Sequence, residues 1–169
     1  MKFFSGKEMD HIKEKTKDNK VEQILLENYD MYYRLAYSYV HNEADAGDIV
    51  QNGAYRVIRN SHTLRKEEYA ATWVYRIMLN EIFRFCKAQE SKVVSLDEMS
   101  VEQGKEDVYS NMDLQRALDS LSYEDKAVVV LRYFEDKKLE EIAEILDENI
   151  NTVKSRLYRS MKKLKLKLE

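Results

Sequence analysis

The 169-residue sequence has no proline, four glycines and one cysteine. Proline and glycine are the residues that interrupt helices most strongly, so their scarcity favours long helical segments. Hydrophobic residues make up 44% of the chain and charged residues 35%, which provides apolar material for a core and charge for solvated helix faces. The composition therefore predicts an all-α protein, in one domain of ordinary size or two small ones.

The low cysteine content excludes an intramolecular disulfide, because Cys86 is the single cysteine. It lies in a helix-like apolar pattern with Phe83 and Phe85, which favours a buried structural thiol over a redox switch. Long apolar runs are also absent: no stretch approaches the roughly 18 residues that a membrane span needs. Residues 1–15 lack the apolar core of a signal peptide, so we expect a cytoplasmic protein.

Catalytic and metal-binding patterns are missing from the sequence as well. The histidines His11, His41 and His62 are isolated from one another and from Cys86, and neither CxxC nor HExxH spacing occurs. The glycines form no phosphate-cradling loop, and the carboxylates are mostly explained as solvated helix faces. The sequence predicts no enzyme activity, no metal site, no cofactor and no small-molecule substrate.

The most informative pattern that is present lies in residues 121–168. Apolar residues recur there at helical spacing in two groups, separated by Asp147, Glu148 and Asn149, which suit a tight turn and can cap the following helix. The first group is Leu139, Ile142, Ala143 and Leu146, and the second is Val153, Leu157, Met161, Leu164 and Leu168. Two short amphipathic helices joined in this way predict a helix-turn-helix.

Charge is segregated between these two helices. Residues 150–168 contain no acidic residue and carry Lys154, Arg156, Arg159, Lys162, Lys163, Lys165 and Lys167. The preceding helix is acidic, so we expect the basic face to have no local partners. The net charge of the chain is −3, and this local excess of cations indicates a helix that fits the major groove of DNA. The alternatives are a merely solvated basic face and, less favoured, a membrane-surface helix, which would need aromatic anchors.

The N-terminal half predicts a first domain over residues 21–88. Residues 1–20 are polar and are expected to fray. Helices are predicted over residues 21–40, over 43–60 after a cap by His41 or Asn42, and over 67–88, with a loop between the last two. The middle helix has Ala46, Ile49, Val50, Ala54, Val57 and Ile58 facing inward, and Asp48, Gln51 and Asn52 facing outward.

Residues 89–110 lose the helical periodicity and are net acidic, which predicts a flexible acidic linker. Residues 111–169 predict a second domain of four helices that ends with the helix-turn-helix. Ser122 is the expected N-cap of the helix that starts at Tyr123. The expected architecture is therefore two small helical domains joined by a tether.

Several motifs together resemble the extracytoplasmic-function (ECF) group of bacterial RNA polymerase sigma factors. They are DAGDIVQNGAYRVIRN, TWVYRIMLN, the acidic linker and LSYEDKAVVVLRYFEDKKLEEIAEILDENINTVKSRLYR. The paired motifs DIVQ and TVKSRLYR are more specific than a lone helix-turn-helix, and the resemblance extends from Val21 to the end of the chain. Within the group, residues 139–159 look most like the sigma V type of Gram-positive bacteria.

The resemblance implies a promoter-specificity subunit whose first domain docks on core RNA polymerase and opens the minus-ten element. The positions that match docking residues for the coiled coil of the β′ subunit are Asp48, Ile49, Gln51 and Asn52. The positions that match minus-ten contacts are Asn60, Ser61, His62, Thr63, Arg65 and Asn80. Polar residues beside aromatics suit the capture of an unstacked base. Trp73 matches a frequent tryptophan, but its spacing from Ile77 favours a place in the core.

By the same resemblance, the second domain reads the minus-thirty-five element. The matching positions are Asn151, Thr152, Lys154, Ser155, Arg156, Tyr158, Arg159 and Lys162. Arginine can bridge O6 and N7 of guanine, whereas Lys162 and its neighbour Lys163 are expected to contact phosphates. Further implied partners are the flap of the polymerase β subunit and an anti-sigma protein, often membrane-bound, in a response to cell-envelope stress.

Two positions depart from the family pattern. Arg84 stands where the family often has aspartate, and Asp147 stands where the turn often has glycine, although aspartate tolerates unusual backbone angles. Two other functions agree with parts of the sequence: a stand-alone helix-turn-helix regulator, which usually binds paired half-sites as a dimer, and a pure interaction protein. The regulator has no need of the DIVQ helix, and the interaction protein has no need of the basic helix.

Overall fold

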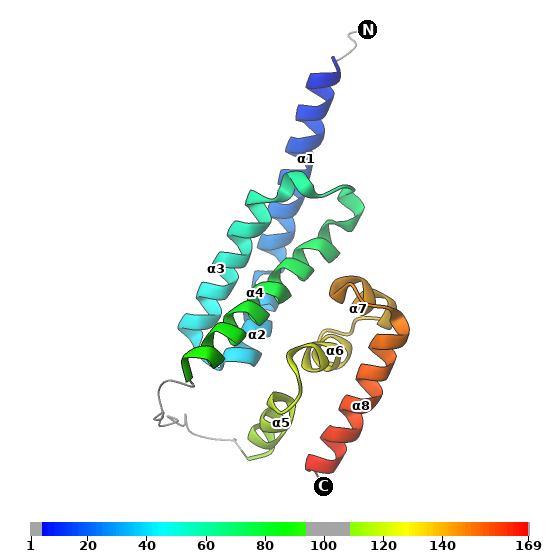
Figure 1. Cartoon of the computed structure of the whole chain (residues 1–169). Helices are drawn as coiled ribbons and strands as arrows, with labels where there is room; N and C mark the ends of the chain where they lie inside the picture. The colour runs from blue at the N-terminus through cyan, green and yellow to red at the C-terminus, as the bar shows by residue number, and fades with distance from the viewer. Residues whose placement is uncertain (1–4, 94–108, 169) are drawn as a thin grey trace. The chain divides into compact units, whose positions relative to one another are not determined.

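The structure is a computed structural model that describes residues 5–93 and 109–168. The regular structure within these residues is helical, with no β-strand, which confirms the all-α prediction. The chain divides into two compact units, unit 1 (Met1–Lys87) and unit 2 (Ala88–Glu169). Figure 1 shows the helices of each unit, coloured along the chain.

Four helices and two short 3-10 turns make up the first part of the described chain. The helices are α1 (Gly6–Glu27), α2 (Tyr29–Val40), α3 (Glu43–Arg59) and α4 (Ala70–Val93), and the turns η1 (Ser61–Thr63) and η2 (Glu67–Tyr69) join α3 to α4. Figure 1 shows α1 (blue) extending past the α3–α4 connection. Apolar side chains of all four helices form the core, among them Val21, Ile24, Tyr32, Leu35, Ile49, Val50, Val57, Val74, Met78 and Ile82.

The N-terminal helix begins earlier than predicted. Residues 6–20 were expected to fray, but they form the first part of α1, and a capping box starts the helix. The backbone N–H of Glu8 donates to Oγ of Ser5 (3.3 Å), and the N–H of Ser5 donates to Oε2 of Glu8 (2.7 Å). The apolar pattern that the sequence prediction used begins only at Val21, so it did not detect this part of the helix.

The single helix predicted over residues 21–40 is two helices, because α1 ends at Asn28. Nδ2 of Asn28 donates to the carbonyl oxygen of Ile24 (2.9 Å), and α2 starts at the next residue. The connection from α2 to α3 was predicted correctly. His41 ends α2 in the left-handed conformation (φ 54°), and Asn42 is the N-cap of α3, accepting at Oδ1 from the N–H of Asp45 (2.9 Å).

α3 approaches α4 closely at Gly53. A Cβ added to Gly53 would lie 2.4 Å from Sδ of Met78, so a larger residue there must displace the methionine side chain. This contact brings α3 and α4 together in the middle of the core.

The predicted inward face of α3 is correct for four of its six residues, namely Ala46, Ile49, Val50 and Val57. Ala54 is half-buried, and Ile58 is 52% exposed, so its placement in the core was wrong. Ile58 follows Ile49 by about two and a half helical turns, which puts it on the opposite side of the helix.

The described part of unit 2 contains four helices after residue 108, as predicted: α5 (Tyr109–Asp119), α6 (Tyr123–Tyr133), α7 (Leu139–Leu146) and α8 (Ile150–Leu168). Ser122 is the N-cap of α6, as expected, because its Oγ accepts from the N–H of Asp125 (3.2 Å). α8 packs on all three other helices. One apolar cluster of the unit is formed by Ala117, Leu118, Leu121, Val129 and Leu164.

The predicted linker of residues 89–110 is too long at both ends. α4 continues to Val93, and α5 already begins at Tyr109. The last turn of α4 carries no strong apolar pattern, but Lys92 lies there, where the helix dipole favours a cation. The rest of the predicted linker, residues 94–108, lies outside the described residues.

Two side chains of α4 were assigned to the core. Cys86 is buried, as expected of a structural thiol. Trp73 is half-buried, so it lies at the edge of the core rather than inside it. Across the described ranges, none of the helices combines the length and apolar character that a membrane span requires.

Candidate nucleic-acid and protein interfaces

The turn of the helix-turn-helix lies between α7 and α8, where the sequence predicted it. Asp147 takes the left-handed conformation (φ 54°, ψ 45°), and the N–H of Glu148 donates to the carbonyl oxygen of Ala143 (3.0 Å). Asn149 then accepts at Oδ1 from the N–H of Asn151 (2.8 Å). Aspartate is therefore compatible with the turn position that the family often fills with glycine.

The inner face of α8 holds the helix on unit 2. Val153 and Leu164 are buried, and Leu157 packs against the apolar cluster. Met161 and Leu168, which the sequence placed on the same stripe, are 39% and 49% exposed. Neighbouring helices therefore cover only part of the apolar stripe of α8.

The outer face of α8 presents seven of the eight predicted minus-thirty-five contacts. The exposed residues are Asn151, Thr152, Lys154, Ser155, Tyr158, Arg159 and Lys162. Tyr158 is the most exposed large hydrophobic side chain of α8, at 76%. Lys154 and Lys162 form no ion pair with any other described residue, so their ammonium groups are available to phosphates.

Arg156 is the exception among the predicted contacts. It donates from Nε to Oε2 and from Nη2 to Oε1 of Glu148 (2.9 Å each), and from Nη1 to Oδ1 of Asp125 (2.8 Å). Its side chain is only 22% exposed. Its guanidinium ties α8 to the preceding turn and to α6, which leaves little of it for DNA, and its contact with the minus-thirty-five element stays a prediction.

Arg159 joins the same cluster from the exposed side. Its Nη2 lies 3.3 Å from Oδ1 and 3.4 Å from Oδ2 of Asp125. The expectation that the basic face has no local partners was wrong for Arg156 and Arg159, since Asp125 on α6 and Glu148 in the turn supply them. The sequence prediction considered the acids of the preceding helix and not Asp125, which is more than thirty residues away.

The charges of this cluster are mutually stabilised. Burial of Asp125 raises the pKa of its carboxyl group, but the hydrogen bonds from Arg156 and Arg159 outweigh this effect and hold the pKa below its ordinary value. The hydrogen bond to Glu148 is the largest cause that raises the pKa of Arg156. Asp125 is therefore a buried carboxylate that stays ionised at neutral pH.

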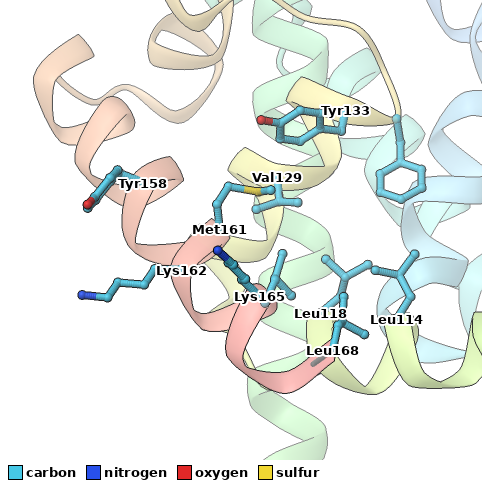
Figure 2. Close-up of a pocket in the computed structure, with 11 residues that line it drawn as sticks. Leu114, Leu118, Val129, Tyr133, Tyr158, Met161, Lys162, Lys165 and Leu168 are labelled. Carbon is cyan, nitrogen blue, oxygen red and sulfur yellow. The ribbon is translucent and has the colours of Figure 1, made fainter.

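A groove of about 760 Å³ lies between α5, α6 and α8. Figure 2 shows its mainly apolar lining, which includes Leu118, Val129, Tyr133, Met161 and Leu168. Lys162 and Lys165 are its charged members. The sequence prediction missed this groove, because it treated the apolar residues of α8 as core.

The exposed face of α3 in unit 1 carries three of the four predicted polymerase contacts. Asp48, Gln51 and Asn52 are exposed. Ile49 is only 1% exposed, which argues against a direct contact with the polymerase, and that contact stays a prediction. Its side chain instead holds α3 in the core of unit 1.

Tyr55 extends the same face of α3 and was not predicted as a contact. Its side chain is 62% exposed, one helical turn after Gln51. The neighbouring Arg56 pairs with Glu81 of α4 (Nε to Oε2, 2.6 Å), which fixes this end of α3. The spacing of Gln51 and Tyr55 on one helix face was the sequence signal that could have identified this residue.

Four of the predicted minus-ten contacts lie together in the connection after α3. They are Asn60, His62, Thr63 and Arg65, all exposed. Oγ1 of Thr63 donates to the carbonyl oxygen of Asn60 (2.7 Å), which closes the first turn of this connection. Asn80 is exposed too, but it lies about three turns into α4 and is therefore separate from the loop along the helix.

Ser61 differs from its neighbours because it is only 5% exposed. Its hydroxyl contacts the carboxylate of Asp18 on α1 and the carbonyl oxygen of Ile58 (3.0 Å). This burial argues against a direct contact of Ser61 with DNA, and that contact stays a prediction. Ser61 attaches the loop to α1, in the part of that helix which the sequence did not predict.

No three histidine, cysteine, aspartate or glutamate side chains within residues 5–93 and 109–168 are grouped so that they could hold a metal ion. In the described part of unit 2, the buried Asp125 and the half-buried Glu148 are paired with arginines instead. The candidate sites are the exposed surfaces of α3, of the loop after it and of α8, together with the groove.

Comparison with known proteins matches both parts of the chain. The family model of sigma-70 region 2 matches residues 24–92, and that of sigma-70 region 4 matches residues 111–164. The RNA polymerase sigma factor SigV of Bacillus subtilis (strain 168) is 45% identical over 140 residues, which cover 81% of this chain and 84% of SigV. The ECF sigma factor SigE of Mycolicibacterium smegmatis is 30% identical over 154 residues, 85% of this chain and 60% of SigE. The chain belongs to the ECF group of the sigma-70 family.

Two solved structures have the same fold. The sigma factor RpoE of Bartonella quintana, determined with the anti-sigma factor NepR, has a TM-score of 0.68 and 21% identity, over 87% of this chain and 95% of RpoE. CnrH, determined with the cytosolic domain of CnrY, has a TM-score of 0.65 and 19% identity, over 93% and 95% of the chains. The resemblance drawn from the motifs is confirmed. This ECF sigma factor directs RNA polymerase to specific promoters, and a stand-alone regulator is not favoured.

Proposed function

We propose that this sigma factor divides promoter recognition between two domains. Residues 21–88 dock on core polymerase and open the minus-ten element, and residues 111–169 read the minus-thirty-five element. The observation that carries the proposal is the outer face of α8, where polar and cationic side chains are exposed while the inner face is held by the apolar core and the Asp125 cluster. A rigidly held helix with exposed hydrogen-bonding groups suits a DNA major groove.

In this assignment, bases are read from the first half of α8. Lys154, Ser155, Tyr158 and Arg159 supply donors and an aromatic ring to base edges. Asn151 and Thr152 lie at the N-terminus of α8, where backbone N–H groups favour a phosphate, and Lys162 lies further along and adds another phosphate contact.

The exposed face of α3 is assigned to the coiled coil of the polymerase β′ subunit. Asp48, Gln51 and Asn52 provide polar contacts, and Tyr55 adds a large ring of the kind that often dominates binding energy. Ile49 and Gly53, on the other side of the helix, pack into the core, so the docking face belongs to a rigid element.

The connection between α3 and α4 is assigned to the minus-ten element. His62 can stack on an extruded base, and Asn60 and Thr63 carry groups that can bond its edges. Arg65 can contact the backbone of the separated strand, and Asn80 extends the surface along α4. Ser61 supports this loop from behind through Asp18.

The α5/α6/α8 groove is assigned to the flap of the polymerase β subunit. Its open shape and apolar lining suit the apolar face of an amphipathic helix. Of the two lysines in its lining, Lys162 is assigned to a DNA phosphate, and Lys165 favours a partner with acidic residues on the flanks of that face.

An anti-sigma protein is proposed as the regulatory partner. RpoE and CnrH, which share the fold, were determined with NepR and with the cytosolic domain of CnrY. We assign to this chain a comparable partner, membrane-bound, that covers the docking surfaces until cell-envelope stress releases them. The sigma factor itself then acts in the cytoplasm, without a cofactor and without catalysing a reaction.

The test is transcription in vitro from a promoter library by core polymerase with the purified sigma factor. We expect defined start sites that share a minus-ten and a minus-thirty-five sequence. The minus-thirty-five preference should change when Lys154, Ser155 or Arg159 is replaced by alanine. Start-site selection that ignores these three substitutions would contradict the assignment of α8.

A further inference from the structure

We infer that Asp125, a residue on α6 that lies behind the DNA-reading face, is a positioning residue for minus-thirty-five recognition: it holds the guanidinium of Arg159 in the orientation that reads DNA. The inference rests on the proposed role of α8. The two are nevertheless separable, because Asp125 and Arg159 lie on different helices and can be replaced independently.

The position of Asp125 excludes a direct role at the DNA surface. It lies in the first turn of α6 and is 3% exposed. Its carboxylate points toward α8, where it accepts hydrogen bonds from Arg156 and Arg159. A buried carboxylate is costly without partners, so these two arginines are what make its presence in the core tolerable.

The two arginines depend on Asp125 to different degrees. Arg156 also donates two hydrogen bonds of 2.9 Å to Glu148, so it keeps a firm anchor when Asp125 is altered. Arg159 has Asp125 as its one ion-pair partner among the described residues, with its Nη2 at 3.3 and 3.4 Å from the two carboxylate oxygens. Its side chain is 55% exposed, so the rest of the guanidinium faces solvent.

This geometry leaves donors of Arg159 available for DNA. Asp125 engages Nη2, and the N–H groups on Nε and Nη1 have no partner within the described part of the chain. Because Nε–H and Nη1–H point away from each other, a two-donor contact with guanine pairs one of them with the second N–H of Nη2. Arginine reads guanine through two donors at once, which requires a fixed orientation of the guanidinium plane. A side chain that is already oriented loses less conformational entropy when it binds.

The effect of removing the charge of Asp125 distinguishes a role in orienting Arg159 from a role in attracting DNA. Asp125 is negatively charged, so removing its charge cannot weaken the attraction of α8 for phosphates. Replacing Asp125 by asparagine should therefore lower the preference for the correct sequence, and leave affinity for random DNA unchanged or higher. Loss of the fold would lower both affinities together.

The experiment compares holoenzymes on a promoter chosen from the transcription library and on variants with single substitutions in the minus-thirty-five element. Asp125→Asn is expected to reduce discrimination by about threefold to tenfold at the base pair that Arg159 reads, which corresponds to losing the pre-ordering of one long side chain. In the Arg159→Ala background, Asp125→Asn should have no further effect on discrimination.

Two further variants keep the test decisive. Arg159→Lys leaves the buried acid and the positive charge in place but removes the planar fork, so it should lose discrimination while keeping affinity for random DNA. Asp119→Asn removes a different ion pair of the same unit, Asp119 to Nζ of Lys126 at 2.6 Å, and should leave discrimination unchanged.

The outcomes separate the inference from the function on which it rests. If Arg159→Ala leaves discrimination intact, the assignment of Arg159 to the minus-thirty-five element fails. If Arg159→Ala lowers discrimination but Asp125→Asn does not, only the positioning role of Asp125 is overturned. The same holds if the double variant loses as much discrimination as the two single substitutions together. An equal loss of affinity on promoter and random DNA by Asp125→Asn would also overturn it.

Discussion

The guanidinium of Arg156 in α8 holds both carboxylate oxygens of Glu148, a residue of the turn that precedes the helix, at 2.9 Å. Arg156→Ala should therefore act on stability before it acts on sequence recognition. Removing one member of a largely buried ion cluster leaves its partners poorly paired, and we expect a loss of about 2–3 kcal/mol in the stability of unit 2. Native-state hydrogen exchange of the amides in α6 and α8 measures this loss.

Lys154→Ala is the matched control for Arg156→Ala, because Lys154 lies on the same helix, is exposed and has no acidic partner among the described residues. It should leave exchange rates unchanged. Full stability of the Arg156→Ala variant, together with loss of preference at one base pair, would show that Arg156 reads DNA after all.

The two glycines of α3 should respond to alanine in opposite directions. At Gly53, a Cβ would lie 2.4 Å from Sδ of the buried Met78, whereas at Gly47 a Cβ would meet nothing within 4 Å beyond the adjacent residues and backbone of its own helix. We expect Gly47→Ala to stabilise unit 1 by about 0.5–1 kcal/mol through helix propensity. Gly53→Ala should destabilise it by about 1 kcal/mol, because overpacking exceeds that gain.

Chemical denaturation followed by the fluorescence of Trp73, the single tryptophan, reports on unit 1 for both variants. Equal effects of the two substitutions would show that Met78 moves aside without cost, and that α3 and α4 are not held at Gly53.

Periodicity and capping predicted most of the fold, because they act within a few residues of sequence. Ser122 was identified as a cap from its position alone, and Asn42 was one of two candidates beside His41; both Ser122 and Asn42 accept the cap hydrogen bonds. The errors arose where a contact joins distant segments. Asp18 reaches Ser61, which removes Ser61 from the surface, and no local pattern signals that contact.

The same limit applies to the candidate sites. The family motifs pointed to α8 and α3, each of which has one exposed and one buried face, but the motifs do not separate side chains that face solvent from side chains that hold the helix. Ile49 and Arg156 belong to the second class, because one is packed in the core and the other is ion-paired to Glu148 and Asp125.

Tyr55 should contribute strongly to polymerase docking. Its ring is 62% exposed on the face that also carries Asp48 and Gln51, and aromatic rings at the centre of an interface often dominate affinity. We expect Tyr55→Ala to weaken binding to core polymerase by about tenfold or more, and the double substitution of Asp48 and Gln51 by alanine to abolish co-purification.

The control for docking is Tyr29→Ala, because Tyr29 is a comparably exposed tyrosine on α2. Binding is measured by titration of core polymerase with labelled sigma factor. If Tyr29→Ala and Tyr55→Ala weaken binding equally, the docking surface is not centred on α3.

The buried carboxylate of Asp125 predicts a specific acid sensitivity. Its pKa lies below the ordinary value of 3.8 in the folded protein, so the folded state binds this proton less readily than the unfolded state. The stabilisation is fully present above about pH 4 and is lost as the pH falls through the folded pKa. Between pH 6 and 3, the melting temperature of the unsubstituted protein should therefore fall more steeply with decreasing pH than that of the Asp125→Asn variant. Parallel curves for the two proteins would show that Asp125 is not ionised in the fold.

Lys162 should contribute affinity without sequence preference. It is exposed on α8 beyond the residues assigned to base edges, and it has no ion-pair partner among the described residues. Each phosphate contact that releases a counterion adds about one unit to the slope of log affinity against log salt concentration. Lys162→Ala should thus lower the slope for holoenzyme binding by about one unit on promoter and random DNA alike.

The control is Lys7→Ala, because Lys7 is an exposed lysine on α1, and this substitution should leave the slope unchanged. A slope unaffected by Lys162→Ala, with weaker binding to core polymerase instead, would place Lys162 in the α5/α6/α8 groove contact rather than on DNA.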